Sequence, residues 1–417
     1  MRMRPFRVDK RVVVIGVVVA VLAASLLAWR PLTIRRHLHR AQRALDERDH
    51  ARALDELRAA LRADPRRAET HFLLARTYRR LGELDKIPAL LRRAETLGGD
   101  PERAQRERWL VLAQLGNLRE AEPHLAGLLA DPRNDGADIC EAFVQGYFSN
   151  LQLRQAELLL DAWEQDFPRD PQPHFMRGYM LHAQGLEPEA VAAYRRGLAL
   201  APHDVTARHR LAQSLLEMGD AEEAAAELQP CLEARPRDLE IRTTWAECLY
   251  RQGKTDVARA VLEQLLGQDP ERFAARRLVG EIELSAGLPE RAVRHLELAA
   301  RKRPFDATTR NALGRALRAL GRAAEAQPHF EYVAEAEESL GRMERQLRLV
   351  LERPGDVELR YEIGTTLLKY GSPDDGARWL RTVLEIDPDH AAARAALAAY
   401  HQSAGRLGAA GDGTGAQ

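Results

Sequence analysis

The chain has 417 residues, of which only 6% are aromatic, and Ala, Leu, Arg and Glu dominate its composition. Because these four residue types lose little side-chain freedom in a helix, the composition favours an all-helical protein. Lys and Arg together number 62, as do Asp and Glu, so the formal net charge is zero and no long-range positive field indicates nucleic-acid binding.

An uncharged apolar segment lies near the amino terminus. Residues 12–29 read VVVIGVVVAVLAASLLAW, and a helix of that length rises about 27 Å, close to the thickness of a bilayer core. Residues 1–11 form a basic tail, and arginines also follow the segment, so the positive-inside rule does not settle its orientation. We expect a transmembrane signal-anchor helix over 12–29 and a single-pass membrane protein, with an extracytoplasmic location favoured for the rest of the chain.

Two other interpretations of this segment stay open. In the first, residues 12–22 are the apolar region of a signal peptide, and the small residues 23–25 are its cleavage site. In the second, the segment is a buried helix of a soluble protein, although it has no polar face. The apolar run continues to Trp29 and stops at Arg30, as an uncleaved anchor with an interfacial aromatic residue does. We therefore prefer the anchor.

Proline, glycine and alanine recur at a constant spacing of 34 residues along the middle of the chain. The recurring residues are Pro168, Pro202, Pro236, Pro270 and Pro304; Gly185, Gly219, Gly253, Gly287 and Gly321; and Ala156, Ala190, Ala224, Ala258, Ala292 and Ala326. This period and these residue types resemble the tetratricopeptide repeat, whose unit is a pair of helices joined by a turn.

One repeat, residues 171–204, shows how the pattern predicts two helices. HFMRGYMLHAQG forms the first helix and PEAVAAYRRGLALAP the second. Gly178 is the small residue where the helices cross, Gly185 is suited to a turn with positive φ, and Tyr194 fills a large position on the second helix. Pro202 ends the second helix because it has no N–H for a continuing helix to use.

The resemblance implies an all-α, right-handed superhelical solenoid of about ten helix-turn-helix repeats over residues 34–390, preceded by the transmembrane helix. The clearest repeats are 171–204, 205–238, 239–272, 273–306, 307–340 and 357–390. An insertion at about 331–353 interrupts the array, and we expect either a lengthened second helix or an extra helix there. Residues 391–405 predict a capping helix that covers the last apolar face. The Gly-rich tail 406–417 is expected to be disordered.

The sequence contains no pattern typical of a catalytic or metal site. It has no nucleophile with a neighbouring base, no paired carboxylates, no Gly-rich phosphate loop and no metal-ligand spacing. The cysteines Cys140, Cys231 and Cys248 lie far apart and form no CxxC pair, so we interpret them as buried free thiols, with contact between Cys231 and Cys248 as the alternative. We expect no enzyme activity, no cofactor and no metal.

In the tetratricopeptide family, the first helices of successive repeats line a concave face that binds proteins. The family's face positions, carried onto the clearest repeats, are Phe175, Tyr179, His182, His209, Gln213, Leu216, Thr243, Glu247, Tyr250, Arg277, Glu281, Leu284, Asn311, Arg315 and Arg318. A mixture of aromatic and charged side chains suits an extended peptide or a partner helix. An ordinary amphipathic surface has the same composition, so that alternative stays open.

The predicted anchor and the predicted repeats together imply a membrane-anchored scaffold that binds one or more proteins or peptides in a concave groove. Basic residues are nearly all Arg, which favours a bacterial source, so we expect a role in assembling a complex at a bacterial membrane. The alternative is a non-catalytic regulatory or substrate-presenting subunit of an enzyme complex.

Overall fold

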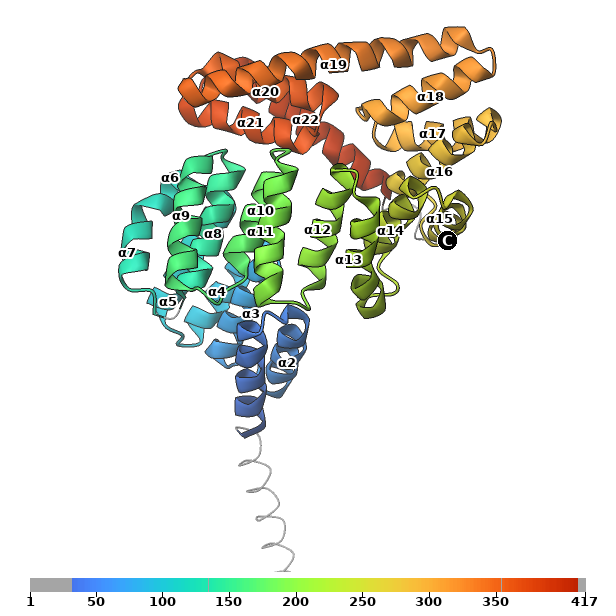
Figure 1. Cartoon of the computed structure of the whole chain (residues 1–417). Helices are drawn as coiled ribbons and strands as arrows, with labels where there is room; N and C mark the ends of the chain where they lie inside the picture. The colour runs from blue at the N-terminus through green and yellow to red at the C-terminus, as the bar shows by residue number, and fades with distance from the viewer. Residues whose placement is uncertain (1–31, 134, 354, 412–417) are drawn as a thin grey trace, which may run out of the picture. The chain divides into compact units, whose positions relative to one another are not determined.

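The computed structural model describes residues 32–133, 135–353 and 355–411 and divides into two compact units. Unit 1 ends at Phe143, and unit 2 begins at Val144. Within these described ranges every regular element is a helix, which confirms the all-helical prediction (Figure 1).

Unit 1 begins with a helix over residues 32–46, and short helices follow it. They are α2 (His50–Ala63), α3 (Ala68–Arg80), a 3-10 turn η1 (Leu84–Lys86), α4 (Ile87–Thr96), α5 (Pro101–Gln114), α6 (Leu118–Ala121), a second 3-10 turn η2 (Glu122–His124), α7 (Leu125–Ala130) and the first part of α8 (Gly136–Ser149). Leu45, Leu57 and Leu91 are fully buried in the apolar core of this unit.

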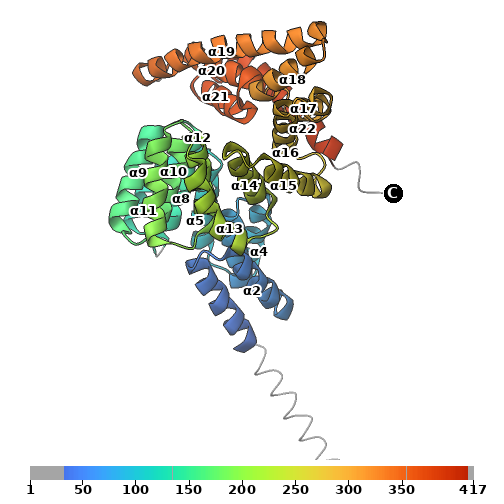
Figure 2. The same cartoon turned by 45° about the vertical axis from the view of Figure 1, so that its right-hand side comes forward.

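Unit 2 consists of consecutive helix pairs that lie side by side (Figures 1 and 2). After the end of α8, they are α9 (Leu153–Asp166), α10 (Gln172–His182), α11 (Glu187–Leu200), α12 (Val205–Glu217), α13 (Ala221–Ala234), α14 (Leu239–Arg251), α15 (Thr255–Gln268), α16 (Phe273–Ser285), α17 (Pro289–Lys302), α18 (Ala307–Ala319), α19 (Ala323–Glu352), α20 (Val357–Tyr370), α21 (Pro373–Ile386) and α22 (Ala391–Gly411). The even-numbered helices from α10 to α18 are the first helices of the predicted repeats.

The recurring residues set the ends of these helices. Asp204 and Asp306 are N-cap residues whose carboxylates accept hydrogen bonds from the backbone N–H groups of Ala207 and Thr309. At the other end, each proline of the 34-residue series directly follows the C-cap residue of a second helix, as Pro202 follows the cap of α11. Capping and proline placement thus repeat with the same period as the helices.

Glycine permits the close crossing of the two helices in the α10–α11 and α16–α17 pairs. A Cβ atom on Gly178 would lie 2.8 Å from the Tyr194 ring, and one on Gly280 would lie 2.5 Å from Leu296. Such distances are shorter than real Cβ contacts, so only glycine allows these large side chains to fill the crossing. The predicted crossing positions are therefore confirmed at these two repeats.

The alanine positions of the second helices lead to a stability prediction. Ala224 on α13 is fully buried, so leucine at this position should overpack the crossing with α12 and destabilise unit 2 by about 1–3 kcal/mol. Glu223 is the neighbouring exposed position on the same helix, and Glu223→Leu is the control. Guanidinium unfolding followed by circular dichroism measures both variants. Equal midpoints for Ala224→Leu and wild type would contradict the packing described here.

A buried network of ion pairs joins α3, α5 and α8 within unit 1. Arg79 donates from Nε to Glu107 at 2.6 Å and from Nη2 to Asp138 at 3.0 Å, and the side chains of Arg79 and Glu107 are each 1% exposed. Arg80 also donates to Asp138, at 2.6 Å, and Arg76 donates to Asp135 at 2.8 Å. Every member of the network has an oppositely charged partner.

Electrostatics keep the carboxylate of Asp138 ionised. Burial opposes its ionisation, but the guanidinium groups of Arg79 and Arg80 outweigh that effect and hold the pKa of Asp138 well below its usual range. Burial also opposes the charge on Arg79, whereas Glu107 and Asp138 favour it, and the pKa of Arg79 is raised. Asp138 and Arg79 are therefore both charged at neutral pH.

The predicted insertion is one continuous helix. α19 runs without a break through 30 residues, so the structure has the first of the two alternatives considered above, a lengthened second helix. It packs against α20, and Tyr332, in its amino-terminal half, donates a hydrogen bond to the backbone oxygen of Lys369 at 2.6 Å. The extra length carries the chain from the α18 pair to the last pair, α20 and α21.

The predicted single-pass membrane localisation needs correction. Residues 1–11 and the proposed transmembrane segment 12–29 lie outside the described residues. Of the helices that the structure describes, none combines the length and the apolar composition needed to cross a bilayer. The longest of them, α19, carries Glu and Arg side chains along its whole length, and such charges are costly in a bilayer core. We therefore do not retain the membrane localisation.

The carboxyl-terminal helix also differs from expectation in its length. α22 starts at Ala391, where a capping helix was predicted, but it continues beyond residue 405 to Gly411. Alanine has the highest helix propensity and is frequent in this stretch, so helical structure persists into the predicted disordered tail. Residues 412–417 of that tail lie outside the described residues.

Candidate functional site: the first-helix face of unit 2

The predicted groove residues lie on α10, α12, α14, α16 and α18, and we call the surface that they share the first-helix face. Each of these helices packs beside the next first helix in unit 2. Side chains on neighbouring first helices are therefore close enough to interact across the helix boundary. The structure brings six of the predicted residues into such cross-helix contacts: Tyr179, His182, His209, Glu247, Tyr250 and Arg277.

Three of the predicted face residues are buried instead. Phe175 is 6% exposed, and its ring packs directly on Gly197 of α11. A Cβ atom on Gly197 would lie only 2.3 Å from that ring. Thr243 is buried and donates its hydroxyl to the backbone oxygen of Leu239, and Leu216 is also buried. These residues belong to the core, so their placement on an open face needs correction. For Phe175 the reason is the missing side chain at Gly197, which leaves space for the ring.

Tyr179 is the exposed aromatic residue at the α10 end of the face. Its side chain is 40% exposed, and the Arg210 guanidinium of α12 lies 4.6 Å from its ring centroid. Its other side meets Phe148 edge to face, with ring centroids 5.6 Å apart. Two neighbours thus hold the ring in place while its remaining surface stays open to solvent.

Histidines continue the face from α10 to α14. Nδ1 of His182 lies 2.9 Å from a Glu187 oxygen and 3.2 Å from the Ser214 hydroxyl of α12. Nε2 of His209 lies 2.8 Å from the Thr244 hydroxyl of α14. Burial lowers the pKa of His209, so its ring is neutral at pH 7 and acts as a hydrogen-bonding group.

Charged residues dominate the face at α14 and α16. Arg277 donates to Glu281 on its own helix at 2.9 Å and lies 3.9 Å from Glu247 on α14. Burial opposes the charge of Arg277, but the two glutamates outweigh it and raise the pKa of the guanidinium. Tyr250 reaches across the same boundary, with its hydroxyl 3.3 Å from that of Ser285.

The face ends on α18 with an exposed basic surface. Asn311, Arg315 and Arg318 are all exposed, and none of the predicted face positions on this helix carries an acid. The Arg318 guanidinium lies over the Phe330 ring of α19, 5.1 Å from its centroid. The remaining predicted residues, Gln213 and Leu284, are half-buried.

Sequence reasoning missed four residues that bridge neighbouring first helices: Arg210, Ser214, Thr244 and Ser285. Arg210 and Thr244 lie 34 residues apart, directly after the face residues His209 and Thr243. This shared position was the signal that could have found them. A repeat position next to the face serves to connect one first helix with the next.

The chemistry of the face is that of binding. Its side chains offer aromatic surface, hydrogen-bonding groups and charges of both signs, arranged along successive helices. Within the described part of the chain, no three His, Cys, Asp or Glu residues gather in a way that could hold a metal ion. All three cysteines are buried, and burial raises the pKa of Cys231 to about 11 and that of Cys248 to about 12.

Two family models, both described as tetratricopeptide repeat, match the chain. One matches residues 38–104, 142–205 and 311–390, and the other matches residues 215–282. The curated proteins include no match to this chain.

Several solved structures are similar in fold. The MamA protein is 18% identical, with a TM-score of 0.32 over 42% of this chain and 96% of that chain. PilW, a widely conserved type IV pilus biogenesis factor, is 18% identical, with a TM-score of 0.42 over 56% of this chain and 99% of that chain. A monomeric mutant of IFIT1 with m7Gppp-AAAA is 14% identical, with a TM-score of 0.42 over 76% of this chain and 90% of that chain.

At these identities and scores the solved structures show a likeness of fold and carry no argument about function. The family models rest on the sequence itself, and the matches to the first of them extend over half of the chain. The chain belongs to the tetratricopeptide repeat family.

Proposed function

We propose that the first-helix face of unit 2 binds a segment of another protein and that the chain is a scaffold that brings proteins together. Tetratricopeptide repeat proteins are generally non-catalytic scaffolds for protein interaction, and the proposal places that interaction on named residues. The observation that carries it is Tyr179, a large aromatic side chain held by Arg210 and Phe148 yet 40% exposed. Aromatic residues of this kind are enriched among the residues that dominate binding energy at interfaces.

Charge along the face supports one orientation of the bound segment. The glutamates of α14 and α16 are compensated by Arg277, whereas Arg315 and Arg318 on α18 are exposed. A partner segment with apolar residues near Tyr179 and acidic residues near α18 would complement both ends of the face. The polar bridges between them offer hydrogen bonds to its backbone.

Site-specific photocrosslinking tests this proposal. We expect a photoreactive phenylalanine at Gln213 or Arg315 to form covalent adducts with the same partner protein in living cells. Matched control variants carry it at Gln229 on α13 or Arg294 on α17, which are exposed positions on second helices. Adducts at the face positions alone support the proposal, because a photoreactive group captures only proteins in direct contact.

Adducts of equal yield at face and control positions, or at the control positions alone, would contradict a binding role for this face. Mass spectrometry of the adducts identifies the partner and separates two roles. A structural or assembly protein fits a scaffold for complex formation, whereas an enzyme fits a regulatory or substrate-presenting subunit.

A further inference from the structure

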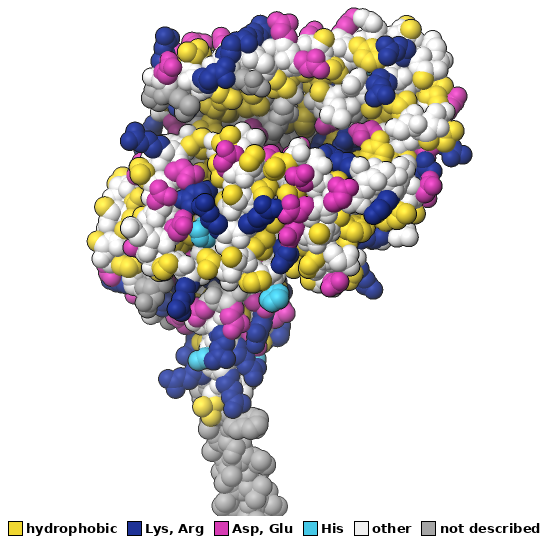
Figure 3. All heavy atoms as spheres, in the orientation of Figure 1, with side chains coloured by type: hydrophobic (Ala, Val, Ile, Leu, Met, Phe, Trp, Pro, Cys, Tyr) yellow, Lys and Arg dark blue, Asp and Glu magenta, His cyan; other side chains and the backbone are white. Residues whose placement is uncertain are grey.

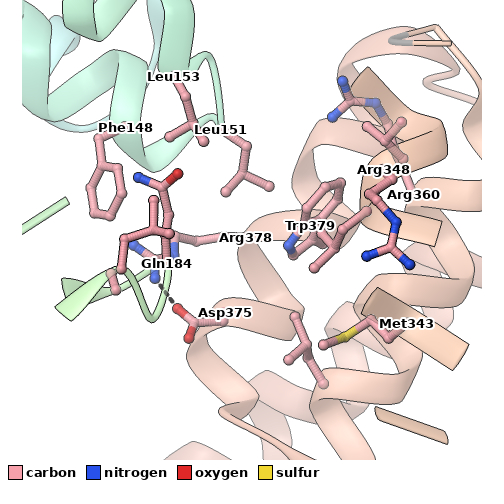
Figure 4. Close-up of a pocket in the computed structure, with 15 residues that line it drawn as sticks. Phe148, Leu151, Leu153, Gln184, Met343, Arg348, Arg360, Asp375, Arg378 and Trp379 are labelled. Atoms are coloured by element: carbon pink, nitrogen blue, oxygen red, sulfur yellow. Dashed lines mark hydrogen bonds and ion pairs between the residues drawn. The ribbon is translucent and has the colours of Figure 1, made fainter. Parts of the chain in front are cut away.

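A cavity of about 720 Å³ lies within unit 2, and none of the predicted face residues lines it (Figure 4). It forms where α19, α20 and α21 lie opposite the α8–α9 and α10–α11 turns, and apolar side chains gather along this seam on the surface shown in Figure 3. Its apolar lining includes Leu151, Leu347 and Trp379, and Figure 4 shows Leu151 projecting toward Trp379 across the open space.

The wall around Trp379 belongs to a small apolar cluster. Val350, Ile363 and Trp379 are buried together, and Leu151 packs against them although it comes from the distant α8–α9 turn. Leu151 itself has a positive φ of 59°, a conformation that is unfavourable for a branched side chain. The turn thus presents an aliphatic side chain to the cavity from a strained backbone.

Three guanidinium groups and a single carboxylate line the same cavity. Arg378 is ion-paired with Asp375 and lies 5.6 Å from the Phe148 ring. Arg360 donates to the Thr382 hydroxyl at 3.0 Å and lies 5.6 Å from the Trp379 ring, and Arg348 is exposed at the rim. The lining therefore carries an excess of positive charge beside an apolar wall.

The environment of two of these groups is poor in water. Burial lowers the pKa of Arg360 and of Arg378, although both remain charged near neutral pH. A guanidinium that has lost part of its hydration gains more from an anionic ligand than one in open solvent does. Figure 4 shows Arg348 and Arg360 on the same side of the cavity as Trp379.

The size and lining of the cavity select the class of ligand. A volume of about 720 Å³ lies within the usual range for small-molecule sites, which are mostly apolar with a few convergent polar groups. A peptide would bring backbone N–H and C=O groups into this space, and each would need a hydrogen-bonding partner that the aliphatic wall does not offer. A single alkyl chain brings no such groups.

We propose that this cavity binds an amphiphile with one alkyl chain and one anionic head group. The alkyl chain lies along Leu151, Leu347 and Trp379, and the head group contacts Arg348 and Arg360. This inference goes beyond the protein-binding role of the first-helix face, since none of the predicted face residues lines the cavity, although Phe148, which does line it, also contacts Tyr179 of that face.

Calorimetric titration of the full chain tests the proposal. Tetradecanoic acid and tetradecyl phosphate, below their micelle concentrations, are the anionic probes, and tetradecan-1-ol is the neutral probe of equal chain length. We expect at least one anionic probe to bind about tenfold more tightly than the alcohol, as a charge-assisted hydrogen bond predicts. The tighter of the two anions identifies the head group as a carboxylate or a phosphate.

Three variants locate the binding. Arg348→Gln should weaken binding of the anion about tenfold and leave that of the alcohol unchanged. Leu347→Trp should narrow the cavity beside Trp379 and weaken binding of both probes, while circular dichroism shows an unchanged helix content. Arg345→Gln changes an exposed arginine on the same helix that does not line the cavity, and it should bind like wild type.

The proposal is overturned if neither anion binds, if the alcohol binds as tightly as both anions, or if Leu347→Trp binds as wild type does. The photocrosslinking result at Gln213 and Arg315 does not depend on these titrations. Failure of the cavity proposal is thus distinguishable from failure of the proposed protein-binding function.

Discussion

Replacing Asp138 with asparagine should destabilise unit 1 by about 3–5 kcal/mol, because it removes one partner from a buried ion pair. Arg79, which is 1% exposed, would keep its charge but lose one of its two carboxylates, and Arg80 would lose the same partner. Hydrogen exchange with mass spectrometry measures the effect, since peptides from α3 and α5 report on unit 1 alone.

The matched control is Glu102→Gln, which breaks an exposed ion pair with Arg133 in the same unit. An exposed pair contributes about 0–1 kcal/mol, so exchange in α3 and α5 should hardly change. Similar exchange in the two variants would show that the buried network does not stabilise unit 1.

Acid provides a second readout of the same network. The folded-state pKa of Asp138 lies below its unfolded value, so its contribution to stability is present in full above about pH 4 and declines as the pH falls further. The stability difference between wild type and Asp138→Asn should therefore be constant from pH 7 to about pH 5 and shrink below about pH 4. A difference that grows on acidification would contradict this sign.

Phe175→Ala should destabilise unit 2 by about 3–5 kcal/mol, in contrast to Tyr179→Ala on the same helix. The Phe175 ring is buried, and it occupies space beside Gly197, which has no side chain with which to fill the void. Tyr179 is exposed, so its loss should cost far less stability and instead weaken capture of a partner by the first-helix face. Guanidinium unfolding and photocrosslinking measure the two effects.

A double-mutant cycle isolates the contact between Phe175 and Gly197. Gly197→Ala alone should destabilise unit 2, because its Cβ would lie 2.3 Å from the ring. In the Phe175→Ala background the same substitution should restore part of the lost stability, because the ring is gone and the methyl group fills space. Additive losses in the double variant would show that the two residues do not share this space.

The repeating part of the fold could be predicted from the sequence because its causes are local. Gly185 adopts a φ of +71° at the turn where positive φ was expected, and Tyr194 fills the crossing opposite Gly178. Each of these features depends on the residue type at a fixed place in one repeat. A 34-residue period therefore predicts them wherever it is kept.

The features that escaped prediction depend on contacts between distant segments. The arginines of α3 look like surface residues in the sequence, and only the folded chain brings Glu107 and Asp138 to them. Phe175 was predicted to lie on the face because of its position in the repeat. The ring is buried instead, because Gly197 has no side chain to occupy the space beside it. Which predicted face residues bind a partner stays a prediction.

The contact of the α8–α9 turn with α21 has a consequence for how unit 2 folds. In an ordinary solenoid each repeat touches only its neighbours, so folding can begin anywhere and spread along the chain. Here Leu151 packs on Trp379 and Phe148 lies against Arg378, which closes a very long loop of chain. Loop closure of this kind raises contact order and slows folding. Because α21 packs on the α8–α9 turn, a substitution that destabilises α21 should also destabilise that turn. The two ends of unit 2 should therefore unfold together instead of fraying one repeat at a time.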